Sequence, residues 1–488
     1  MESKKENAEI VKNYKLMKKL GKGSYGMVYL AQNIQNSQYV AIKKFDEISE
    51  DSQTIIQIAR QLTILRLCNH PNIVRIIDAF LFPEKSRSLY IVMEYSCYDL
   101  FMFYHSKLYL TDTYVKSIMY SLISAIAYLH SAGIIHRDIK PTNVLLNEDC
   151  QLKMCDFDLA KSIHEVVNDD PFVKSFNNKY NNGDETKALD SFIEHENMPQ
   201  FPLSHREIID NPIEKGDWKR NLNKTHNESV SINSKNVLND RKYPNCIKSF
   251  YISRKKEEIA QILNETKDER RKYKRDLSKH VCSRWYRPPE IILGENYGYS
   301  ADIWGLGCIF AELLCLRKKS KIVVDDRSIF LKGNFCFPLT PKSEKNEDEK
   351  DQMNVILKKL GSPDDKDNSF ITRETTLKYI KKFGSFQKNE FKTIVPGINQ
   401  IESDLLSKML EFNPYLRINA QSLLLHPYFD KVVDKIPFIP SKYLITLDFD
   451  LSHEIVISNV KNVIKKELEY YALKNSEINH KFGEPFSK

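Results

Sequence analysis

A glycine-rich segment near the start of the chain constrains the fold more than any other feature of the sequence. Gly21, Gly23 and Gly26 form the pattern GxGxxG, which two different phosphate-binding structures share. In a dinucleotide-binding fold a helix begins at this point, whereas here Val28 and Tyr29 continue the pattern of a strand. The sequence therefore predicts a hairpin whose glycine backbone can lie close to phosphates. An ordinary glycine turn is the alternative.

Three more segments follow in a set order, and each carries a group that phosphate chemistry needs. Lys43 ends the strand-like run VAIK, from which its ammonium group can reach phosphates beneath the hairpin. The run HRDIKPTN places Asp138, Lys140 and Asn143 on one loop, which supplies a base, a cation and an oxygen ligand for Mg²⁺. Asp156 adds a hard carboxylate of the kind that Mg²⁺ prefers. A lone lysine on a strand usually faces solvent, but chance does not explain all these motifs in this order.

In this order the motifs resemble those of the eukaryotic protein kinases. The resemblance covers about Tyr14 to Ser162 and Ser278 to Phe438. It implies an α+β fold of two lobes, with a β-rich N-lobe, a helical C-lobe and a long insertion in the activation segment. The predicted units are a polar tail at 1–13, the N-lobe at 14–96, the first part of the C-lobe at 97–162, the insertion at 163–277, the second part of the C-lobe at 278–437 and a C-terminal extension at 438–488.

The region after the insertion resembles the group that holds cyclin-dependent and mitogen-activated kinases. The run SRWYRPPE, from Ser283 to Glu290, is similar to the end of that group's activation segment, and Arg417 stands where the partner of Glu290 is expected. The run ADIWG contains Asp302, which in that group holds the catalytic loop. Three further segments resemble the mitogen-activated branch most closely: residues 351–363, 409–414 and 441–471. We therefore favour that branch.

The resemblance also implies which residues bind ATP and Mg²⁺ and transfer the phosphoryl group. Asp138 would accept the proton of the substrate hydroxyl with Lys140 beside it, and Asn143 and Asp156 would hold the metal. Met93 would be the gatekeeper of the adenine pocket. The expected nucleotide contacts are Leu20, Gly21, Gly23, Gly26, Val28, Ala41, Lys43, Met93, Glu94, Ser96 and Leu145.

The same resemblance implies the substrate class. Lys140 and Ser283 together are similar to the family's serine/threonine pattern. In the cyclin-dependent and mitogen-activated group, Arg287 is associated with accepting proline after the target residue. We therefore expect an enzyme that phosphorylates proteins at Ser-Pro and Thr-Pro sites. We also expect the protein to be a monomer.

The sequence departs from the kinase pattern at two positions of the site. Gln61 stands where the family has the glutamate that pairs with Lys43, and no glutamate lies between Glu50 and Glu84. A glutamine can still accept a hydrogen bond from Lys43, at a loss of roughly 1–2 kcal/mol, so we expect reduced rather than abolished activity. Asp158 replaces the glycine of the DFG motif. It could recruit a cation or face solvent, and we favour solvent because turn aspartates usually bond their own backbone.

Control of the activation segment is expected to differ as well. Where the mitogen-activated branch has a Thr-x-Tyr phosphorylation pair, this chain has Ser278 followed by lysine and histidine, so dual phosphorylation is not possible. Arg137 could bind a phosphate placed on Ser278 by an upstream kinase, which would order the segment. Alternatively, Ser278 is an ordinary surface serine.

The insertion at 163–277 has abundant asparagine, alternating charges and sparse apolar residues, so we expect it to be mostly disordered. Its basic end, which includes Arg270 and Lys274, could bind nucleic acid, but a charge run is more often a solvated face. The whole chain has 73 Lys and Arg against 65 Asp and Glu, a mild excess that suits anionic partners of any kind and selects none. Nucleic acid is therefore not an expected partner.

The cysteine content and the polar N-terminus predict a location inside the cell. Nine cysteines without a CxxC pair, after a polar and lysine-rich N-terminus, predict a reducing compartment, the cytoplasm or the nucleus or both. No stretch reaches the roughly 18–20 apolar residues of a spanning helix, so no membrane partner is expected. The predicted function is a serine/threonine kinase of intracellular signalling. The alternative, motivated by Gln61 and Asp158, is a kinase-shaped scaffold that binds nucleotide and partners but transfers phosphate poorly.

Overall fold

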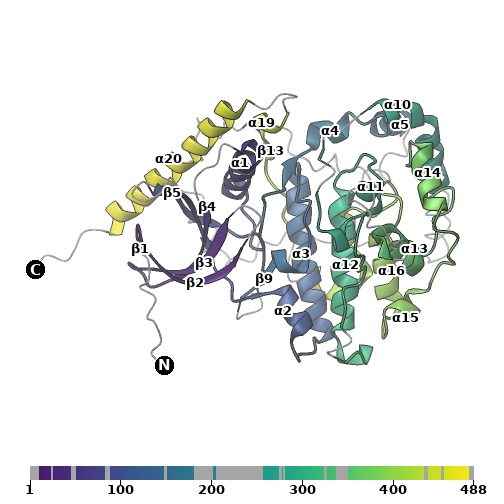
Figure 1. The fold of residues 1–488 in the computed structure, drawn as a ribbon, viewed down its shortest axis with the longest axis horizontal. Helices are drawn as coiled ribbons and strands as arrows, with labels where there is room; N and C mark the ends of the chain where they lie inside the picture. Colours follow the sequence, from purple (N-terminus) through teal and green to yellow (C-terminus); the bar gives the residue numbers. More distant parts are fainter. Residues whose placement is uncertain are drawn as a thin grey trace, which may run out of the picture.

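The predicted two-lobed α+β kinase fold is confirmed: a curled sheet forms one end of the molecule and a larger group of helices forms the other (Figure 1). The computed structural model describes residues 10–22, 26–45, 51–82, 88–147, 151–180, 202–204, 256–273, 277–278, 281–323, 327–336, 350–433, 438–451 and 456–482. None of the helices in these stretches is both long enough and apolar enough to cross a membrane.

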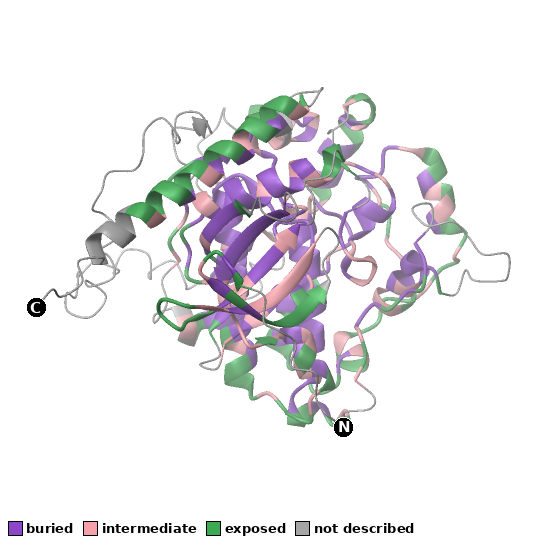
Figure 2. Cartoon of the chain, turned by 60° about the vertical axis from the view of Figure 1, so that its left-hand side comes forward, coloured by how far each residue is buried: buried purple, intermediate pink, exposed green. Residues whose placement is uncertain are grey.

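The N-lobe is built on a six-stranded antiparallel sheet with the strand order β1-β2-β3-β4-β6-β5. Successive side chains of a strand point to opposite faces. Val40 and Ile42 therefore pack into one small apolar cluster, whereas Phe45 joins the main core on the other face, with helix α1. Strand β6 is buried along almost its whole length, whereas β3 is mostly half-buried (Figure 2). The elements are β1 (Ile10–Val11), β2 (Tyr14–Lys22), β3 (Met27–Asn33), β4 (Tyr39–Phe45), α1 (Ser52–Leu67), β5 (Ile76–Phe82) and β6 (Ser88–Glu94).

Helix α1 carries the residue that replaces the family's glutamate. Asp51 caps its N-terminus by accepting hydrogen bonds from the backbone of Gln53 and Thr54, which satisfies two of the amides that a helix start leaves unpaired. Gln61 lies on the buried face of the helix, at 1% exposure, together with Ile58 and Leu62. The helical spacing thus turns Gln61 toward strand β4 rather than toward solvent.

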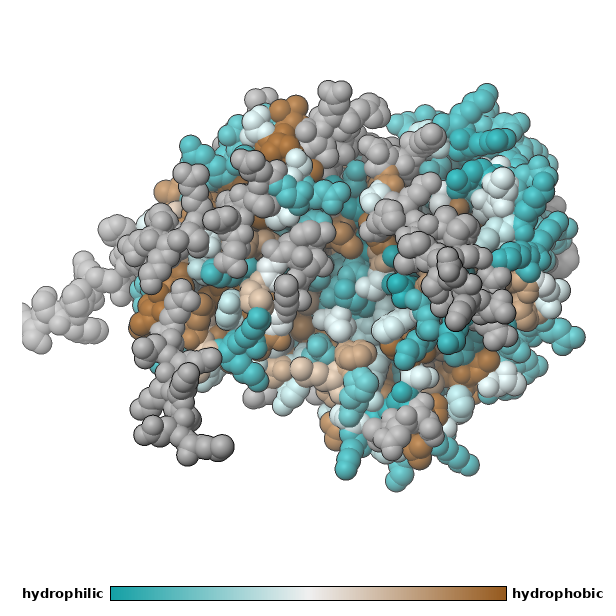
Figure 3. Space-filling view, viewed as in Figure 1, coloured by the Kyte–Doolittle hydropathy of each residue, from teal (hydrophilic) through white to brown (hydrophobic). Residues whose placement is uncertain are grey.

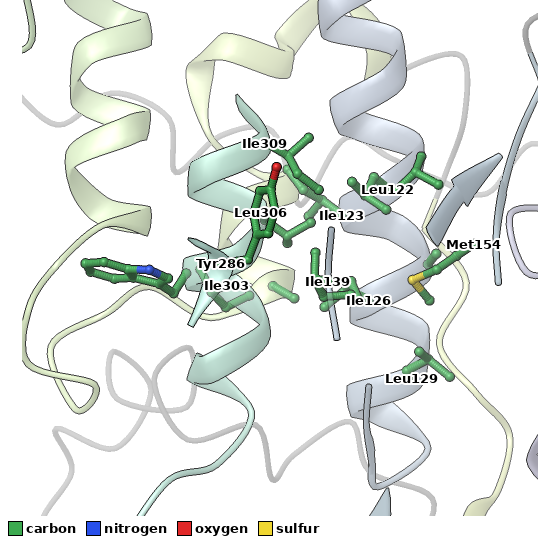
Figure 4. Packing of buried hydrophobic residues seen from close by; sticks show 14 of the residues in the cluster. Leu122, Ile123, Ile126, Leu129, Ile139, Met154, Tyr286, Ile303, Leu306 and Ile309 are labelled. Carbon is green, nitrogen blue, oxygen red and sulfur yellow. The ribbon is translucent and has the colours of Figure 1, made fainter. Parts of the chain in front are cut away.

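Helices α3 and α12 form the centre of the C-lobe, and their apolar side chains interdigitate around the segment that follows the HRD motif (Figure 4). Gly305 of α12 faces Ile139, and a Cβ at position 305 would lie 2.8 Å from the Ile139 Cβ. Glycine therefore allows the helix to approach the loop that carries Asp138.

The C-lobe comprises a longer series of short strands and helices. Its elements are β7 (Tyr98–Asp99), α2 (Leu100–His105), α3 (Asp112–Ser131), β8 (Ile134–Ile135), the 3₁₀ turn η1 (Pro141–Asn143), β9 (Val144–Leu146), β10 (Leu152–Met154), β11 (Lys161–Ser162), α4 (His164–Asn168), α5 (Pro171–Tyr180), β12 (Pro202–Ser204), a helix at 256–265, α10 (Lys267–Lys272), η4 (Arg284–Tyr286), α11 (Pro289–Ile292), α12 (Ser300–Cys315), η5 (Lys318–Ser320), α13 (Gln352–Leu360), α14 (Glu374–Lys381), α15 (Phe391–Ile394), α16 (Gln400–Met409), α17 (Ala420–Leu424), η8 (Pro427–Phe429), α18 (Asp430–Val433), β13 (Leu444–Thr446) and α19 (Asp448–Leu451).

The C-terminal extension returns to the N-lobe. Helix α20 (Ile457–Phe482) lies along α1 and β5 (Figure 1). Its Glu467 is 1% exposed and accepts hydrogen bonds from Arg66, at 2.5 and 3.1 Å, and from the Thr63 hydroxyl, at 3.1 Å. The extension is therefore tied to the helix that carries Gln61.

Both described ends of the predicted insertion are ordered helices. Phe172 of α5 packs edge-on against Tyr415, at 4.6 Å between ring centroids. Arg270 of α10 was expected on a solvated face, and that expectation is wrong: it is 3% exposed and donates hydrogen bonds to the carbonyls of Leu263, Ser369 and Phe370. The buried apolar residues of these helices are few, Phe172 and Phe176 in α5 and Ile259, Ala260, Ile262 and Leu263 in the helix at 256–265, so they do not stand out in a polar composition. Residues 181–201 and 205–255 lie outside the described part.

Candidate active site

The sheet register places Lys43 directly under the glycine hairpin. Gly21 is opposite Val28 across β2 and β3, and Val28 is opposite Lys43 across β3 and β4. A Cβ at Gly26 would lie 2.5 Å from the Lys44 carbonyl oxygen, so this turn requires glycine. Gly23 lies outside the described residues.

The partner of the Lys43 ammonium is Asp158. Its two carboxylate oxygens accept hydrogen bonds from the lysine at 2.7 and 2.6 Å, and the side chains are 6% and 10% exposed. Our expectation that Asp158 faces solvent is therefore wrong. The physical reason is that burial removes water from both groups, so the lysine and the carboxylate each need an ionic partner.

Gln61 makes the weaker contact that the sequence predicts. Its Oε1 accepts a hydrogen bond from Lys43 at 3.3 Å. Its amide nitrogen donates to the sulfur of Met93 at 3.9 Å. Gln61 is thus shared between the lysine and the expected gatekeeper, and it brings no charge to either.

The turn after β10 accepts an aspartate at position 158 without backbone strain. The residue with positive φ in this turn is Asp156, at 65°, and aspartate is among the residues that enter the left-handed region most readily. Phe157 between them is fully buried and packs against the His136 ring, at 4.9 Å between centroids. This anchor holds the two carboxylates on either side of it.

The Lys43 ammonium lies near two carboxylates, those of Asp156 and Asp158. Lys43 lies 3.7 Å from Asp156 as well as in contact with Asp158. Burial opposes the charge of Lys43, but Asp158 and Asp156 outweigh it and raise the lysine pKa. Burial likewise opposes ionisation of Asp156, yet Lys43, Lys140 and His136 lower its pKa. Burial raises the pKa of Asp158 to about 6, with Asp156 adding to the effect and Lys43 opposing it. With all three ionised, the cluster carries a net negative charge that favours a further cation.

The catalytic loop is held from beneath by Asp302. One oxygen of its buried carboxylate accepts the backbone N–H of His136 and the other accepts that of Arg137, both at 2.9 Å. This confirms the expected role of Asp302. Arg137 has a φ of 67°, a conformation that most side chains avoid, and these hydrogen bonds help to stabilise it.

Asp138 is 6% exposed, and neighbours contact both oxygens of its carboxylate. Lys140 donates to Oδ2 at 2.5 Å, and the backbone N–H and hydroxyl of Ser283 donate to Oδ1 at 3.0 and 2.9 Å. The amide nitrogen of Asn143 donates to the Asp138 carbonyl at 2.9 Å and to Oδ2 at 3.2 Å. Four groups therefore hold this carboxylate in one position.

Asn143 and Asp156 are the two expected oxygen ligands of the metal, and the backbone joins them. Asn143 donates through its amide nitrogen, so its amide oxygen is the atom suited to a cation, and its backbone carbonyl accepts the N–H of Cys155, next to Asp156, at 3.0 Å. The Asp156 side chain is 38% exposed. One carboxylate and one amide oxygen fit Mg²⁺, which binds a few protein oxygens and completes its shell with phosphates and water. Within the described residues, no group of three or more His, Cys, Asp or Glu residues forms a metal site.

The remaining expected nucleotide contacts come from both lobes, and Figure 3 shows a hydrophilic hollow between the lobes. Ala41 is opposite Met93 across β4 and β6, and Leu145 lies on β9 of the C-lobe. The half-buried residues are Val28, Ala41, Glu94, Ser96 and Leu145, whereas Leu20 and Gly21 are exposed.

Two arginines stabilise the end of the activation segment through hydrogen bonds. The Arg417 guanidinium forms the expected pair with Glu290, at 2.7 and 3.0 Å, with both side chains fully buried. Arg287 donates to the carbonyls of Val281, at 3.0 Å, and Cys282, at 2.8 Å. The segment just before Ser283 thereby has a defined shape.

Two contacts of the site were not predicted from the sequence: the Lys43–Asp158 pair and the anchoring of α1 by α20. A signal for the first was present. The helix lacks a glutamate, and the turn has an extra carboxylate two residues after Asp156, so the charge lost at one position is matched at another. No comparable signal marked Glu467, because its partner Arg66 is 401 positions away.

Comparison with known proteins agrees with this geometry. The protein kinase domain family matches residues 14–179 and 259–429. Mitogen-activated protein kinase 7 of Arabidopsis thaliana is 26% identical over 466 residues, which cover 95% of this chain and 90% of that protein. Mitogen-activated protein kinase spm1 of Schizosaccharomyces pombe is 27% identical over 421 residues, covering 85% of this chain and 70% of that protein.

Proposed function

Because the chain belongs to the protein kinase domain family and is related to the mitogen-activated protein kinases, we propose that it transfers the γ-phosphoryl group of ATP to serine and threonine hydroxyls of proteins. The main observation in support of this proposal is the fixed position of the Asp138 carboxylate. One of its oxygens accepts a hydrogen bond from Lys140 and the other accepts one from Ser283. Asp156 and Lys43 stand at the same site.

The residues have complementary roles in this chemistry. Asp138 orients the substrate hydroxyl and accepts its proton, while Lys140 balances charge that builds on the transferring group. Lys43 holds the ATP phosphates from the N-lobe side. Asn143 and Asp156 would hold Mg²⁺, which supplies charge neutralisation to the phosphates when bound. The protein thus contributes mainly position and electrostatic stabilisation.

The activation segment supports proline after the target residue. Cys282 has a φ of 62°, and its carbonyl, like that of Val281, accepts a hydrogen bond from Arg287. These carbonyls are therefore already occupied beside the site where Ser283 meets Asp138. A substrate residue with an N–H would leave a donor without a partner there, whereas proline has no N–H to satisfy. We therefore propose Ser-Pro and Thr-Pro sites.

Ser278 is the proposed site of control by an upstream kinase. It is exposed, and its carbonyl accepts a hydrogen bond from the Tyr297 hydroxyl at 2.8 Å. Arg137 donates to the same hydroxyl at 3.2 Å, so its guanidinium lies close to the segment that would carry the phosphate. Unchanged activity of Ser278→Ala, purified from the native cell, would overturn this proposal.

The proposed compartment is the cytoplasm or nucleus, and the proposed active form is a monomer. Within the described residues no disulfide joins the cysteines, which supports a reducing compartment.

The test of the function is transfer of labelled phosphate from Mg·ATP to a mixture of Ser-Pro and Thr-Pro peptides. Asp138→Asn keeps the shape of the side chain and removes the base, so we expect transfer to fall by about 10²-fold or more. Asp169→Asn is the matched control, because Asp169 forms an exposed ion pair with Lys174 at the surface, at 2.8 Å. Wild-type protein that binds nucleotide without transferring phosphate, with or without phosphorylation at Ser278, would favour the scaffold function instead.

A further inference from the structure

We propose that Asp158 is a positioning residue that replaces the missing helix glutamate as the carboxylate partner of Lys43 and so aligns this lysine with the ATP phosphates. The proposal rests on the proposed function, because it assigns a role within the same site. The two departures from the kinase pattern then have one explanation: the carboxylate that is absent at Gln61 is supplied by Asp158.

The distances separate the two candidates for this role. Both oxygens of Asp158 contact the ammonium, at 2.6 and 2.7 Å, whereas Gln61 offers one neutral oxygen at 3.3 Å. Hydrogen bonds between ionised groups are shorter and roughly twice as strong as neutral ones. Asp158 therefore determines where the ammonium lies, and Gln61 only adds to it.

The burial of the pair makes the partner necessary. The Lys43 side chain is 6% exposed and that of Asp158 is 10% exposed. A buried ammonium without a carboxylate would retain the full cost of its desolvation. Asp156 lies farther away, at 3.7 Å, and its more exposed carboxylate is suited to a metal ion. Asp158 is thus the carboxylate that can serve the lysine while Asp156 serves the cation.

This exchange moves the anchor of Lys43 from a helix to a turn. In a chain with a helix glutamate, the position of the lysine depends on the position of that helix. Here the anchor lies one residue beyond Phe157, whose buried ring holds the turn against His136. A single turn then carries both the proposed metal ligand, Asp156, and the lysine partner, Asp158. A change in the conformation of this turn would therefore disturb the contacts of both the metal ion and Lys43 with the ATP phosphates.

The experiment is a cycle of substitutions that moves the carboxylate between the two positions. The variants are Asp158→Gly, Gln61→Glu and the combination of both. The first readout is the dissociation constant for a non-hydrolysable ATP analogue, measured by calorimetry with Mg²⁺ and with EDTA. The second is the separate change in kcat and KM for ATP. Asp169→Asn is the surface control.

The proposal predicts that Gln61→Glu strengthens nucleotide binding in the Asp158→Gly background but not in the wild-type background. Asp158→Gly should weaken nucleotide binding by about 10- to 100-fold, the loss expected for a charged hydrogen-bonding partner. In that background Gln61→Glu should restore most of the affinity, because it supplies the carboxylate from the helix. In the wild-type background the same substitution should weaken binding or leave it no better, because it adds a third carboxylate to one lysine.

Two results would overturn the proposal. Asp158→Gly could bind nucleotide as tightly as the wild type or more tightly, which would make Asp158 a competitor of the phosphates. Alternatively, Gln61→Glu could have the same effect in both backgrounds, which would mean that the two positions do not share the lysine. Asp158→Asn, nearly isosteric, repeats the cycle with the turn intact if glycine loosens the fold.

The binding readout separates this proposal from the proposed function. If wild-type protein binds the nucleotide but transfers no phosphate, the function fails, while the cycle still decides whether Asp158 positions Lys43. If transfer is normal and the cycle shows no coupling, only the role of Asp158 fails.

Discussion

The contact between helices α20 and α1 makes a quantitative prediction about the C-terminal extension. Glu467→Ala removes a carboxylate that is fully buried and accepts three hydrogen bonds, two from Arg66 and one from Thr63. The Arg66 side chain is only 8% exposed, so its charge would remain buried without this partner. Removing one member of a buried ion pair costs about 3–5 kcal/mol, and we expect the docking of α20 to weaken by about 3 kcal/mol.

Hydrogen–deuterium exchange is the assay, because a loss of this size raises the exchange of protected amides by about 100-fold. The increase should appear in both α20 and α1. Glu469→Ala on the same helix is the control, since Glu469 forms an exposed pair with Lys465 at 4.0 Å and should change stability by less than about 0.5 kcal/mol. Arg66→Met combined with Glu467→Met should restore most of the protection. Unchanged exchange of α1 in Glu467→Ala would show that this carboxylate does not hold the two helices together.

Three further predictions concern the C-lobe. Gly305→Ala should lower stability by about 1–3 kcal/mol, measured by urea unfolding, and should reduce kcat because the new Cβ pushes Ile139 next to Asp138; an unchanged kcat would contradict the close approach. Burial raises the pKa of Glu312 to about 7, so between about pH 4.5 and 7 the folded protein retains a proton that the unfolded chain has released. The free energy of unfolding should therefore fall by up to about 3 kcal/mol as the pH rises through this range. Glu312→Gln should flatten this dependence when urea midpoints at pH 5 and 8 are compared. Arg270→Met should leave buried carbonyls without a donor and make residues 256–273 more sensitive to protease, whereas equal resistance would mean that the arginine does not anchor them.

The parts of the site that lie close in the sequence could be predicted from it. Asp138, Lys140 and Asn143 occupy one short loop, so their spacing alone brings them together. Helical periodicity turns Gln61 toward the core, and strand alternation puts Lys43 on the face toward α1. In each case the backbone geometry of a single element decides the direction of the side chain.

The contacts between distant segments needed the tertiary structure. The turn at Asp158 and the strand at Lys43 are 115 positions apart, and the sequence indicated an aspartate that bonds its own backbone. Arg270 belongs to a basic run, and only the packing of its helix on the C-lobe buries it.

The kinase fold, the order of its motifs and the missing helix charge can be inferred from the amino-acid sequence, because these are properties of local pattern. The origin of the compensating charge and the contact of the C-terminal helix with α1 become visible only in the folded chain. The physical reason is that a buried charge is stabilised by whichever opposite charge the fold brings within hydrogen-bonding distance, and periodicity along the chain does not report that distance.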